Sequence, residues 1–373
     1  MVSIVYAHDG TSVYDELFLK HLTQRNRVYF LTFNKEPRNV GEKAQLVRMR
    51  EPCAFSELNL LEGLRMYLSF FLRAFILRVH LRRVQPQLVV GCMATKYGFY
   101  SALTGFRPLV VIVWGSDVLV TSKRFFFFRF MAKYALKNAD AVILDSEIQE
   151  KAAVQLGCRP DRVFRFPWFD LGSILPQKSR SEVREQLGWQ DNILVFSARG
   201  HEPIYGVEYL IEAIPEVVEK EPRSRFLIVG DGQLTESFKQ RVRQLGVGKY
   251  VKFLGRLPRE ETITYLNASD INVSASFSDG TSASLLEAMA LAVPSVVTNI
   301  PGNMEWILDG GNGCLVPIRD SKSLAERILV LARDSESRQE LGQEARRTVE
   351  TRVNWLEHMK ALDDLIQKLV MEA

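Results

Sequence analysis

Short apolar runs alternate with amphipathic stretches along almost the whole chain, and this alternation limits the folds it can adopt. Ten of the runs are rich in Val and Ile: VSIVYA, VYFLTF, QLVVG, PLVVIVW, DAVILDS, NILVFSAR, RFLIVG, VKFLG, INVSAS and PSVVTN. The stretches between them, such as YDELFLKHLTQ and VEYLIEAIPEVVEK, repeat apolar residues at helical spacing. Strands that alternate with helices are typical of parallel sheets covered by helices on both faces. We therefore predict an α/β chain built from doubly wound parallel sheets.

The length of 373 residues favours two domains over a single core. The pattern is interrupted by polar sequence around 168–190 and restarts at NILVFSAR. We predict one Rossmann-like domain over 1–175 and a second over 176–355, with an amphipathic helix over 356–373 that packs back toward the first. Ligands of such sheets bind beyond the carboxyl ends of the strands, so we expect a ligand site where the two domains face each other across a cleft.

Composition narrows the class of protein. Hydrophobic residues make up 47% of the chain and charged residues 25%, which is typical of a soluble globular protein. No basic leader precedes the first strand, and LSFFLRAFILRV is broken by Arg73 and Arg78, so we expect neither a signal peptide nor a membrane span. The cysteines form no CxxC pair and are interpreted as reduced thiols of a cytoplasmic protein: Cys53, Cys92, Cys158 and Cys314.

Positive charge is concentrated in the first half. Residues 1–170 hold 24 Lys and Arg against 15 Asp and Glu, whereas the remainder holds 24 against 29. Two segments interleave cations with aromatic residues; their cations are Arg65, Arg73, Arg78, Arg82, Arg83, Lys123, Arg124, Arg129, Lys133 and Lys137. This mixture suits an anionic membrane surface. The alternative is that the apolar residues form a core beneath a solvated basic face. Nucleic acid is disfavoured, since no known binding motif occurs.

In the segment SFSDGTSASLLEAMA, the carboxylate of Glu287 stands within the apolar stretch that follows the small residues. Ser284 and Glu287 have the spacing of a capping box, which would account for the glutamate alone. The small residues that precede it allow backbone N–H groups to approach an anion at a helix start. The segment therefore predicts either a helix cap or a phosphate-binding loop.

With the following AMALAVPSVVTNIPGNMEWILDGGNGCLVP, this segment resembles the retaining glycosyltransferases of the GT-B fold, in the large family four (GT4) that uses activated sugars. The motif of that family is Glu-x7-Glu, and here seven residues separate Asp279 from Glu287. The resemblance implies two Rossmann-like domains, a nucleoside-diphosphate sugar as donor, and no metal or other cofactor.

Carried over by position, Glu287 would hold the ribose hydroxyls of the nucleotide. Asp279 would contact the donor sugar, and because it is one methylene shorter than the usual glutamate, the identity of that sugar stays open. The backbone amides that would face the diphosphate or the sugar belong to Gly280, Thr281, Ser282, Ala283 and Ser284.

Three further segments extend the resemblance. LIVGDGQL and VKFLGRLPREE end strands in loops that would frame the nucleobase, through Gly230, Gly232, Arg256 and Leu257. A tight turn would explain the glycines equally well. In SARGHEPIYG, Arg199 matches a basic residue that reaches the leaving phosphate, and a surface ion pair is its alternative. Tyr205 stands where the family commonly has a lysine.

The first half matches more weakly. Gly10 and Thr11 stand at the start of a predicted helix. They resemble a loop of the family in which the backbone approaches the donor sugar. In VIVWGSD, Trp114 replaces a frequent histidine, while Asp117 matches and would touch an acceptor hydroxyl or stabilise positive charge at the sugar carbon. Its alternative is a helix N-cap. Such retaining enzymes have no obvious protein nucleophile, so no acid–base pair of carboxylates is expected.

The sequence therefore predicts a cytoplasmic, membrane-peripheral glycosyltransferase at the inner face of the membrane. It would transfer a sugar to a hydroxyl of a lipid-linked or glycan acceptor with retention of configuration. Two alternatives stay open: a GT-B-type phosphorylase or nucleotide-sugar epimerase, and a sugar-nucleotide-binding protein without catalysis. The replacements at Asp279, Tyr205 and Trp114 keep the second alternative open.

Overall fold

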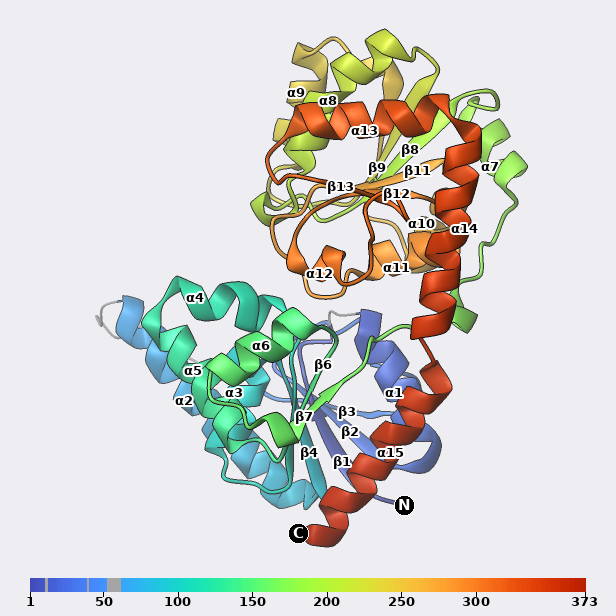
Figure 1. Cartoon of the computed structure of the whole chain (residues 1–373). Helices are drawn as coiled ribbons and strands as arrows, with labels where there is room; N and C mark the ends of the chain where they lie inside the picture. Colours follow the sequence, from blue (N-terminus) through green and yellow to red (C-terminus); the bar gives the residue numbers. More distant parts are fainter. Residues whose placement is uncertain (11–12, 39, 52–61) are drawn as a thin grey trace. The chain divides into compact units, whose positions relative to one another are not determined.

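The chain folds into two compact units, seen in a computed structural model that describes residues 1–10, 13–38, 40–51 and 62–373 (Figure 1). The first unit comprises Met1–Trp168 together with Leu356–Ala373, and the second comprises Phe169–Trp355. The second unit begins at Phe169. The interruption of the strand-and-helix pattern had predicted this boundary at residue 176.

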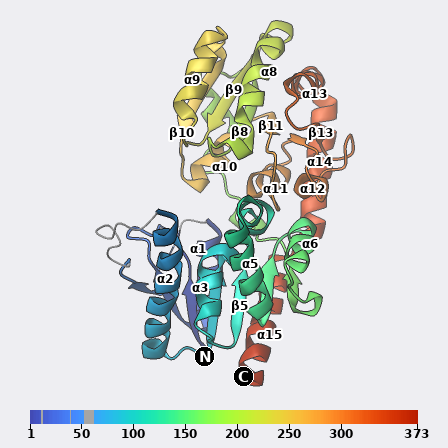
Figure 2. The same ribbon diagram turned by 90° about the vertical axis from the view of Figure 1, so that its left-hand side faces the viewer.

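The first unit is built on a seven-stranded parallel sheet with the order β3-β2-β1-β4-β5-β6-β7. Its strands are β1 (Ser3–Ala7), β2 (Arg27–Thr32), β3 (Gln45–Arg48), β4 (Leu88–Cys92), β5 (Leu109–Ile112), β6 (Ala141–Leu144) and β7 (Val163–Arg165). Its helices are α1 (Val13–Arg25), α2 (Glu62–Val84), α3 (Gly98–Leu103), α4 (Ser122–Arg124), α5 (Phe126–Asn138), α6 (Glu147–Gln155) and the C-terminal α15 (Trp355–Glu372). In Figure 2, α2, α3 and α5 lie together on one side of this unit.

The second unit is built on a six-stranded parallel sheet with the order β10-β9-β8-β11-β12-β13. Its strands are β8 (Ile193–Ala198), β9 (Ser224–Val229), β10 (Val251–Gly255), β11 (Ile271–Ser274), β12 (Ser295–Thr298) and β13 (Cys314–Val316). Its helices are α7 (Arg180–Leu187), α8 (Val207–Lys220), α9 (Thr235–Gln244), α10 (Arg259–Asn267), α11 (Ala283–Ala290), α12 (Pro301–Met304), α13 (Ser321–Arg333) and α14 (Ser335–Arg352).

Both faces of the second sheet are buried, which explains the continuous apolar runs. In β8, Val195 packs into the core beneath α8 and α13, while Leu194 and Phe196 pack on the opposite face with residues of α10 and α11. Successive side chains of a strand point to opposite faces, so a run buried on both sides must be apolar throughout. The prediction of doubly wound parallel sheets is confirmed.

The C-terminal helix α15 belongs to the first unit, although it follows the second in sequence. His21 of α1 lies 3.0 Å from Asp363 of α15, measured from Nε2 to Oδ1. The ring of His358 stacks on Phe166 with centroids 5.4 Å apart. The amphipathic pattern of residues 356–373 therefore reflects packing against residues that are distant in sequence.

Candidate functional site

The site residues predicted for the second half gather at one edge of the second sheet. Arg199 follows β8, Gly230 follows β9, Arg256 follows β10, and Asp279 follows β11. These four strands are consecutive neighbours in the sheet. The carboxyl ends of parallel strands are where open α/β sheets bind ligands, so the arrangement has the position of a binding site.

Arg199 lies at the centre of this edge. Its Nη1 is 2.9 Å from Oδ2 of Asp279, and its Nε donates a 2.9 Å hydrogen bond to Oγ of Ser274. Its Nη2 donates to Oγ of Ser282, and the guanidinium lies 5.7 Å from the ring centre of Tyr205. The ion pair that was the alternative for Arg199 is present, and its partner is Asp279, itself a predicted site residue.

Glu287 is buried on α11, with only 6% of its surface exposed. Its Oε1 accepts a 2.8 Å hydrogen bond from Nε of Arg259, the first residue of α10. Burial raises the pKa of the Glu287 carboxyl, and the positive charges of Arg259 and Arg199 oppose that rise. A buried carboxylate with a cationic partner can stay ionised and accept hydrogen bonds from ligand hydroxyls.

The capping-box interpretation of Ser284 and Glu287 is wrong. Helix α11 begins at Ala283, its N-cap is Ser282, and no side-chain cap hydrogen bond is made. Ser284 therefore lies inside the first turn, and Glu287 turns instead to Arg259. A cation on a neighbouring helix decides the direction of the carboxylate, and no pattern within the segment reveals that cation.

The small residues before α11 are packed closely against α12 and the residues that follow it. A Cβ atom at Gly302 would lie 2.1 Å from the carbonyl oxygen of Gly280. The indole Nε1 of Trp306 donates to Oγ1 of Thr281 at 3.4 Å. Ser282, Ala283 and Ser284 form the start of α11, where the first N–H groups have no partner within the helix. Such a helix start suits an anion, and contact of these amides with a diphosphate stays a prediction.

The glycines after β9 are required by the backbone. Gly230 has φ of +135°, and a Cβ there would lie 1.8 Å from the carbonyl oxygen of Arg199. A Cβ at Gly232 would lie 2.7 Å from the carbonyl oxygen of His201. The two loops can approach this closely only without side chains. Close loop packing therefore explains both glycines, and their contact with a nucleobase stays a prediction.

The loop after β10 holds two predicted residues and one that the sequence reasoning missed. Arg256 is exposed, and Leu257 packs against the apolar cluster on one face of the sheet. The residue that reaches Glu287 is Arg259. One signal could have found it: a buried glutamate needs a cation, and Arg259 lies soon after the carboxyl end of β10, in the same parallel sheet as β11.

Asp117 is fully buried in the first unit and lies in the turn that follows β5. The N-cap of that turn is Ser116, so the N-cap alternative for Asp117 is wrong. Its Oδ2 accepts a 2.7 Å hydrogen bond from the backbone N–H of Ala94 in the loop after β4. Burial raises the pKa of Asp117 to about 6.

Gly10 follows β1 with φ of +69°, and a Cβ there would lie 2.6 Å from Cβ of Pro37. Its backbone geometry thus explains the glycine. Thr11 lies outside the described residues.

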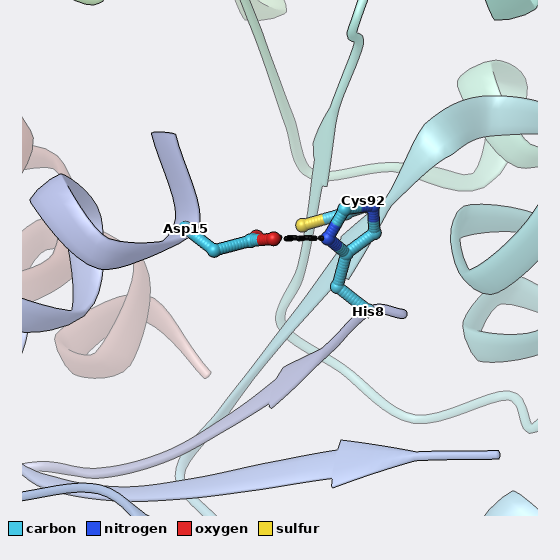
Figure 3. Close-up of side chains that lie close together, drawn as sticks. All are labelled: His8, Asp15 and Cys92. Atoms are coloured by element: carbon cyan, nitrogen blue, oxygen red, sulfur yellow. Dashed lines mark hydrogen bonds and ion pairs between the residues drawn. The ribbon is translucent and has the colours of Figure 1, made fainter. Parts of the chain in front are cut away.

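A buried polar cluster lies at the carboxyl ends of β1 and β4 in the first sheet (Figure 3). Nδ1 of His8 is 2.7 Å from Oδ2 of Asp15, and the hydroxyl of Tyr6 donates to Oδ1 of Asp15 at 2.9 Å. Ligand-type atoms of His8, Asp15 and Cys92 lie within 4.8 Å of one another. Burial raises the pKa of the Cys92 thiol, which opposes the thiolate form that metals prefer. The hydrogen bonds account for the cluster without an ion.

Trp114, which stands where the resemblance led us to look for a histidine, packs against His8. The two ring centroids are 5.8 Å apart, and the ring of Trp168 lies 6.2 Å from that of Trp114. A histidine from the end of β1 is thus brought to the end of β5 by the strand order.

The basic and aromatic segments form both core and surface. Phe70, Ala74 and Met131 are buried in the first core, as the alternative interpretation expected. Other large apolar side chains on the same helices are exposed: Leu68, Phe71, Phe75, Phe125, Phe126 and Phe130. The ring of Phe99 contacts the rings of Phe71 and Phe130 at centroid distances of 6.2 and 6.1 Å.

The exposed cations of these segments are Arg78, Arg82, Arg83, Lys123, Arg124, Arg129, Lys133 and Lys137. We refer to these exposed apolar residues and cations together as the basic aromatic surface.

Arg73 is half-buried and pairs with Glu51 at 3.0 Å. The side chain of Arg65 lies outside the part of the chain that the structure describes.

Among the described helices, none is long and apolar enough to cross a membrane. Cys92, Cys158 and Cys314 are free and buried, and Cys53 lies outside the described residues.

Comparison with known families matches both parts of the chain to glycosyltransferases. Residues 179–348 match the family described as Glycosyl transferases group 1, and residues 4–146 match the family described as Glycosyl transferase 4-like. Each match covers less than half of the chain, and together they extend over most of both units.

Individual relatives agree with these matches. The putative glycosyltransferase EpsD of Bacillus subtilis is 32% identical over 171 residues, which are 45% of this chain and 44% of that protein. A UDP-Gal:alpha-D-GlcNAc-diphosphoundecaprenol alpha-1,3-galactosyltransferase of Escherichia coli is 28% identical over 56% of this chain and 55% of its own. The chain spans about half the length of these curated relatives.

A solved structure matches nearly the whole chain. Alr3699/HepE of Anabaena, in complex with UDP-glucose, superimposes with a TM-score of 0.81 and 19% identity, covering 99% of this chain and all of the other. At this identity the likeness establishes the fold. The chain has the GT-B fold, with two Rossmann-like units, as the resemblance implied.

Proposed function

We propose that this chain is a retaining glycosyltransferase that moves a sugar from a nucleoside-diphosphate donor to a hydroxyl of a lipid-linked or glycan acceptor. The observation that carries the proposal is the buried, cation-paired Glu287 on the helix that follows the small-residue loop, beside the Arg199–Asp279 pair. The family matches in both units and the structural similarity to a protein that binds UDP-glucose support it.

In this proposal each group of the second unit has one task. Glu287 accepts hydrogen bonds from the ribose hydroxyls, and Asp279 accepts one from a hydroxyl of the donor sugar. The amides at the start of α11 and the guanidinium of Arg199 neutralise the diphosphate as it leaves. Fixed donors aimed at developing charge are an effective form of catalysis, and no metal is needed for that task.

The transfer itself balances without a protein nucleophile. A bond forms between the acceptor oxygen and the anomeric carbon, while the bond from that carbon to the diphosphate oxygen breaks and its electron pair leaves with the diphosphate. The acceptor proton passes to a diphosphate oxygen on the same face of the sugar. Asp117 contacts the acceptor or stabilises the positive charge that develops on the sugar.

The acceptor side of the proposal rests on the basic aromatic surface. Exposed phenylalanines surrounded by cations fit an anionic bilayer, where each cation near the surface contributes on the order of 1 kcal/mol. The galactosyltransferase relative acts, by its name, on a diphosphoundecaprenol-linked sugar. We therefore propose peripheral binding to the inner face of the membrane, where such an acceptor is reached.

The test is direct. Thermal shifts of the purified chain with a panel of nucleoside diphosphates and their sugars identify the donor, because ligand binding stabilises the native state by mass action. NMR of the product's anomeric proton gives the configuration. Weakened but measurable binding in Glu287→Gln supports the site, whereas unimpaired transfer by that variant contradicts it. Phosphorolysis with free phosphate would indicate a phosphorylase, and interconversion of two nucleotide sugars would indicate an epimerase. Nucleotide binding without transfer or donor hydrolysis would indicate a binding protein without catalysis.

A further inference from the structure

Arg259 makes two contacts that join the site to the beginning of the second unit. Its Nε donates to Oε1 of Glu287 at 2.8 Å, and its Nη1 donates to Oγ of Ser173 at 3.1 Å. Ser173 is itself held, since its hydroxyl donates to the carbonyl oxygen of Asp170 at 2.7 Å. All of these residues belong to the second unit, so the arrangement is a property of that unit alone.

The two oxygens of Glu287 differ. Oε1 is occupied by Arg259, whereas Oε2 accepts no hydrogen bond from any residue in the described ranges. The side chain is 8% exposed, and that of Arg259 is 22% exposed. A guanidinium fixed at two points thus holds a carboxylate that retains one oxygen for a ligand.

Burial opposes ionisation of Glu287, and within the described ranges two arginines favour its charged form. These are Arg259 on α10 and Arg199 after β8. The apolar residues that pack with α11 include Ala345 and Val349 of α14. Arg199 already forms an ion pair with Asp279, whereas Arg259 forms its ion pair with Glu287.

We infer that Arg259 is a positioning residue of the nucleotide site, which keeps Glu287 ionised and directs its Oε2 toward a hydroxyl of the nucleotide. The inference rests on the proposed function, because it assigns Glu287 to the ribose of the donor. Arg259 acts through Glu287 and needs no contact of its own with the ligand. Removing it leaves a buried carboxyl whose pKa rises further, because less positive charge then opposes the effect of burial, and a protonated carboxyl is a poorer acceptor.

The experiment measures binding of the nucleoside diphosphate that stabilises the wild type most, between pH 6 and pH 9. The full-length variants are Arg259→Met, Arg259→Lys and Glu287→Gln, with Arg243→Met as a control at an exposed arginine on α9. We expect wild type and control to bind with nearly constant affinity. Arg259→Met should bind at least tenfold more weakly at pH 6 and recover as the pH rises, and Arg259→Lys should lie between them. In the Glu287→Gln background the Arg259 substitution should have no further effect.

A second readout does not need the nucleotide. The stability lost on Arg259→Met should grow between pH 5 and pH 8, as Glu287 is forced to ionise without its partner, and this growth should disappear with Glu287→Gln. The inference is overturned if Arg259→Met weakens binding equally at every pH and also in the Glu287→Gln background, since Arg259 would then contact the ligand itself. Absence of nucleotide binding by the wild type overturns the proposed function instead, and the stability series then decides the role of Arg259 separately.

Discussion

Arg199 and Asp279, which lie on the loops after two adjacent strands, form a 2.9 Å ion pair at the carboxyl edge of the second sheet. The same guanidinium also bonds Ser274 and Ser282, so its position is fixed before any ligand arrives. Asp279 reaches Arg199 with a short side chain. The shorter residue at the first position of the Glu-x7-Glu motif that this segment resembles is thus compatible with an ordered site.

Replacing Arg199 should affect turnover more than binding. We expect Arg199→Met to lower kcat by about 10²-fold or more, because one fixed donor to a leaving group contributes on that scale. Steady-state kinetics with the donor found by thermal shift give the value. Arg243→Met is the matched control, and an unchanged kcat in Arg199→Met would remove Arg199 from the reaction.

Asp279→Glu tests whether the short carboxylate selects the donor. The longer side chain completes the Glu-x7-Glu motif that this segment resembles, so we expect nucleoside-diphosphate binding within about threefold of wild type, less than 1 kcal/mol. The ratio of kcat/KM between two donor sugars should change. Competition between paired donors measures that ratio, and an identical ratio in both proteins would show that selectivity lies elsewhere.

Asp117 should make stability depend on pH. Its pKa is raised to about 6 in the fold from the ordinary value of 3.8, so its contribution is fully present below pH 3.8 and is lost as the pH rises through 6. Between pH 5 and pH 8 the loss is roughly 1 kcal/mol. Urea unfolding of wild type and Asp117→Asn over this range gives the difference. Parallel profiles would show that Asp117 is not the titrating group.

Gly230→Ala should unfold the second unit far more easily. The new Cβ would lie 1.8 Å from the carbonyl oxygen of Arg199, at a φ of +135° that side chains avoid. We expect a loss of roughly 3 kcal/mol or more. Gly248→Ala is the control, since nothing lies within 4 Å of a Cβ there. Equal melting temperatures for the two variants would contradict the tight loop packing.

Membrane binding should depend on the exposed rings. Phe75 and Phe126 are 62% and 81% exposed, so Phe75→Ser with Phe126→Ser should leave the core intact. We expect flotation with anionic liposomes to fall severalfold and wild-type flotation to weaken at high salt. Leu308→Ser, at a 72% exposed position of the second unit, is the control. If flotation depends neither on anionic lipid nor on the two phenylalanines, the basic aromatic surface does not bind membranes.

The apolar runs by themselves located ten of the thirteen strands that the described residues form. The three they missed, β3, β7 and β13, are strands of three or four residues at the sheet edges. An edge strand has one neighbour and needs less apolar sequence, so the alternation is weakest there. The run of small residues before Glu287 likewise marked the loop before α11, because few side chains fit so closely packed a backbone.

The partners of the site residues came only from the tertiary structure. Glu287 could be found in the sequence as an isolated buried charge, but its interpretation as a cap failed because Arg259, 28 positions away, binds it. His8 and Trp114 meet for the same reason: the strand order brings the ends of distant strands together. Periodicity records which face of an element is buried, since burial follows from the local pattern of apolar residues. Which charge meets which carboxylate depends on the order of strands in a sheet, and no single segment encodes that order.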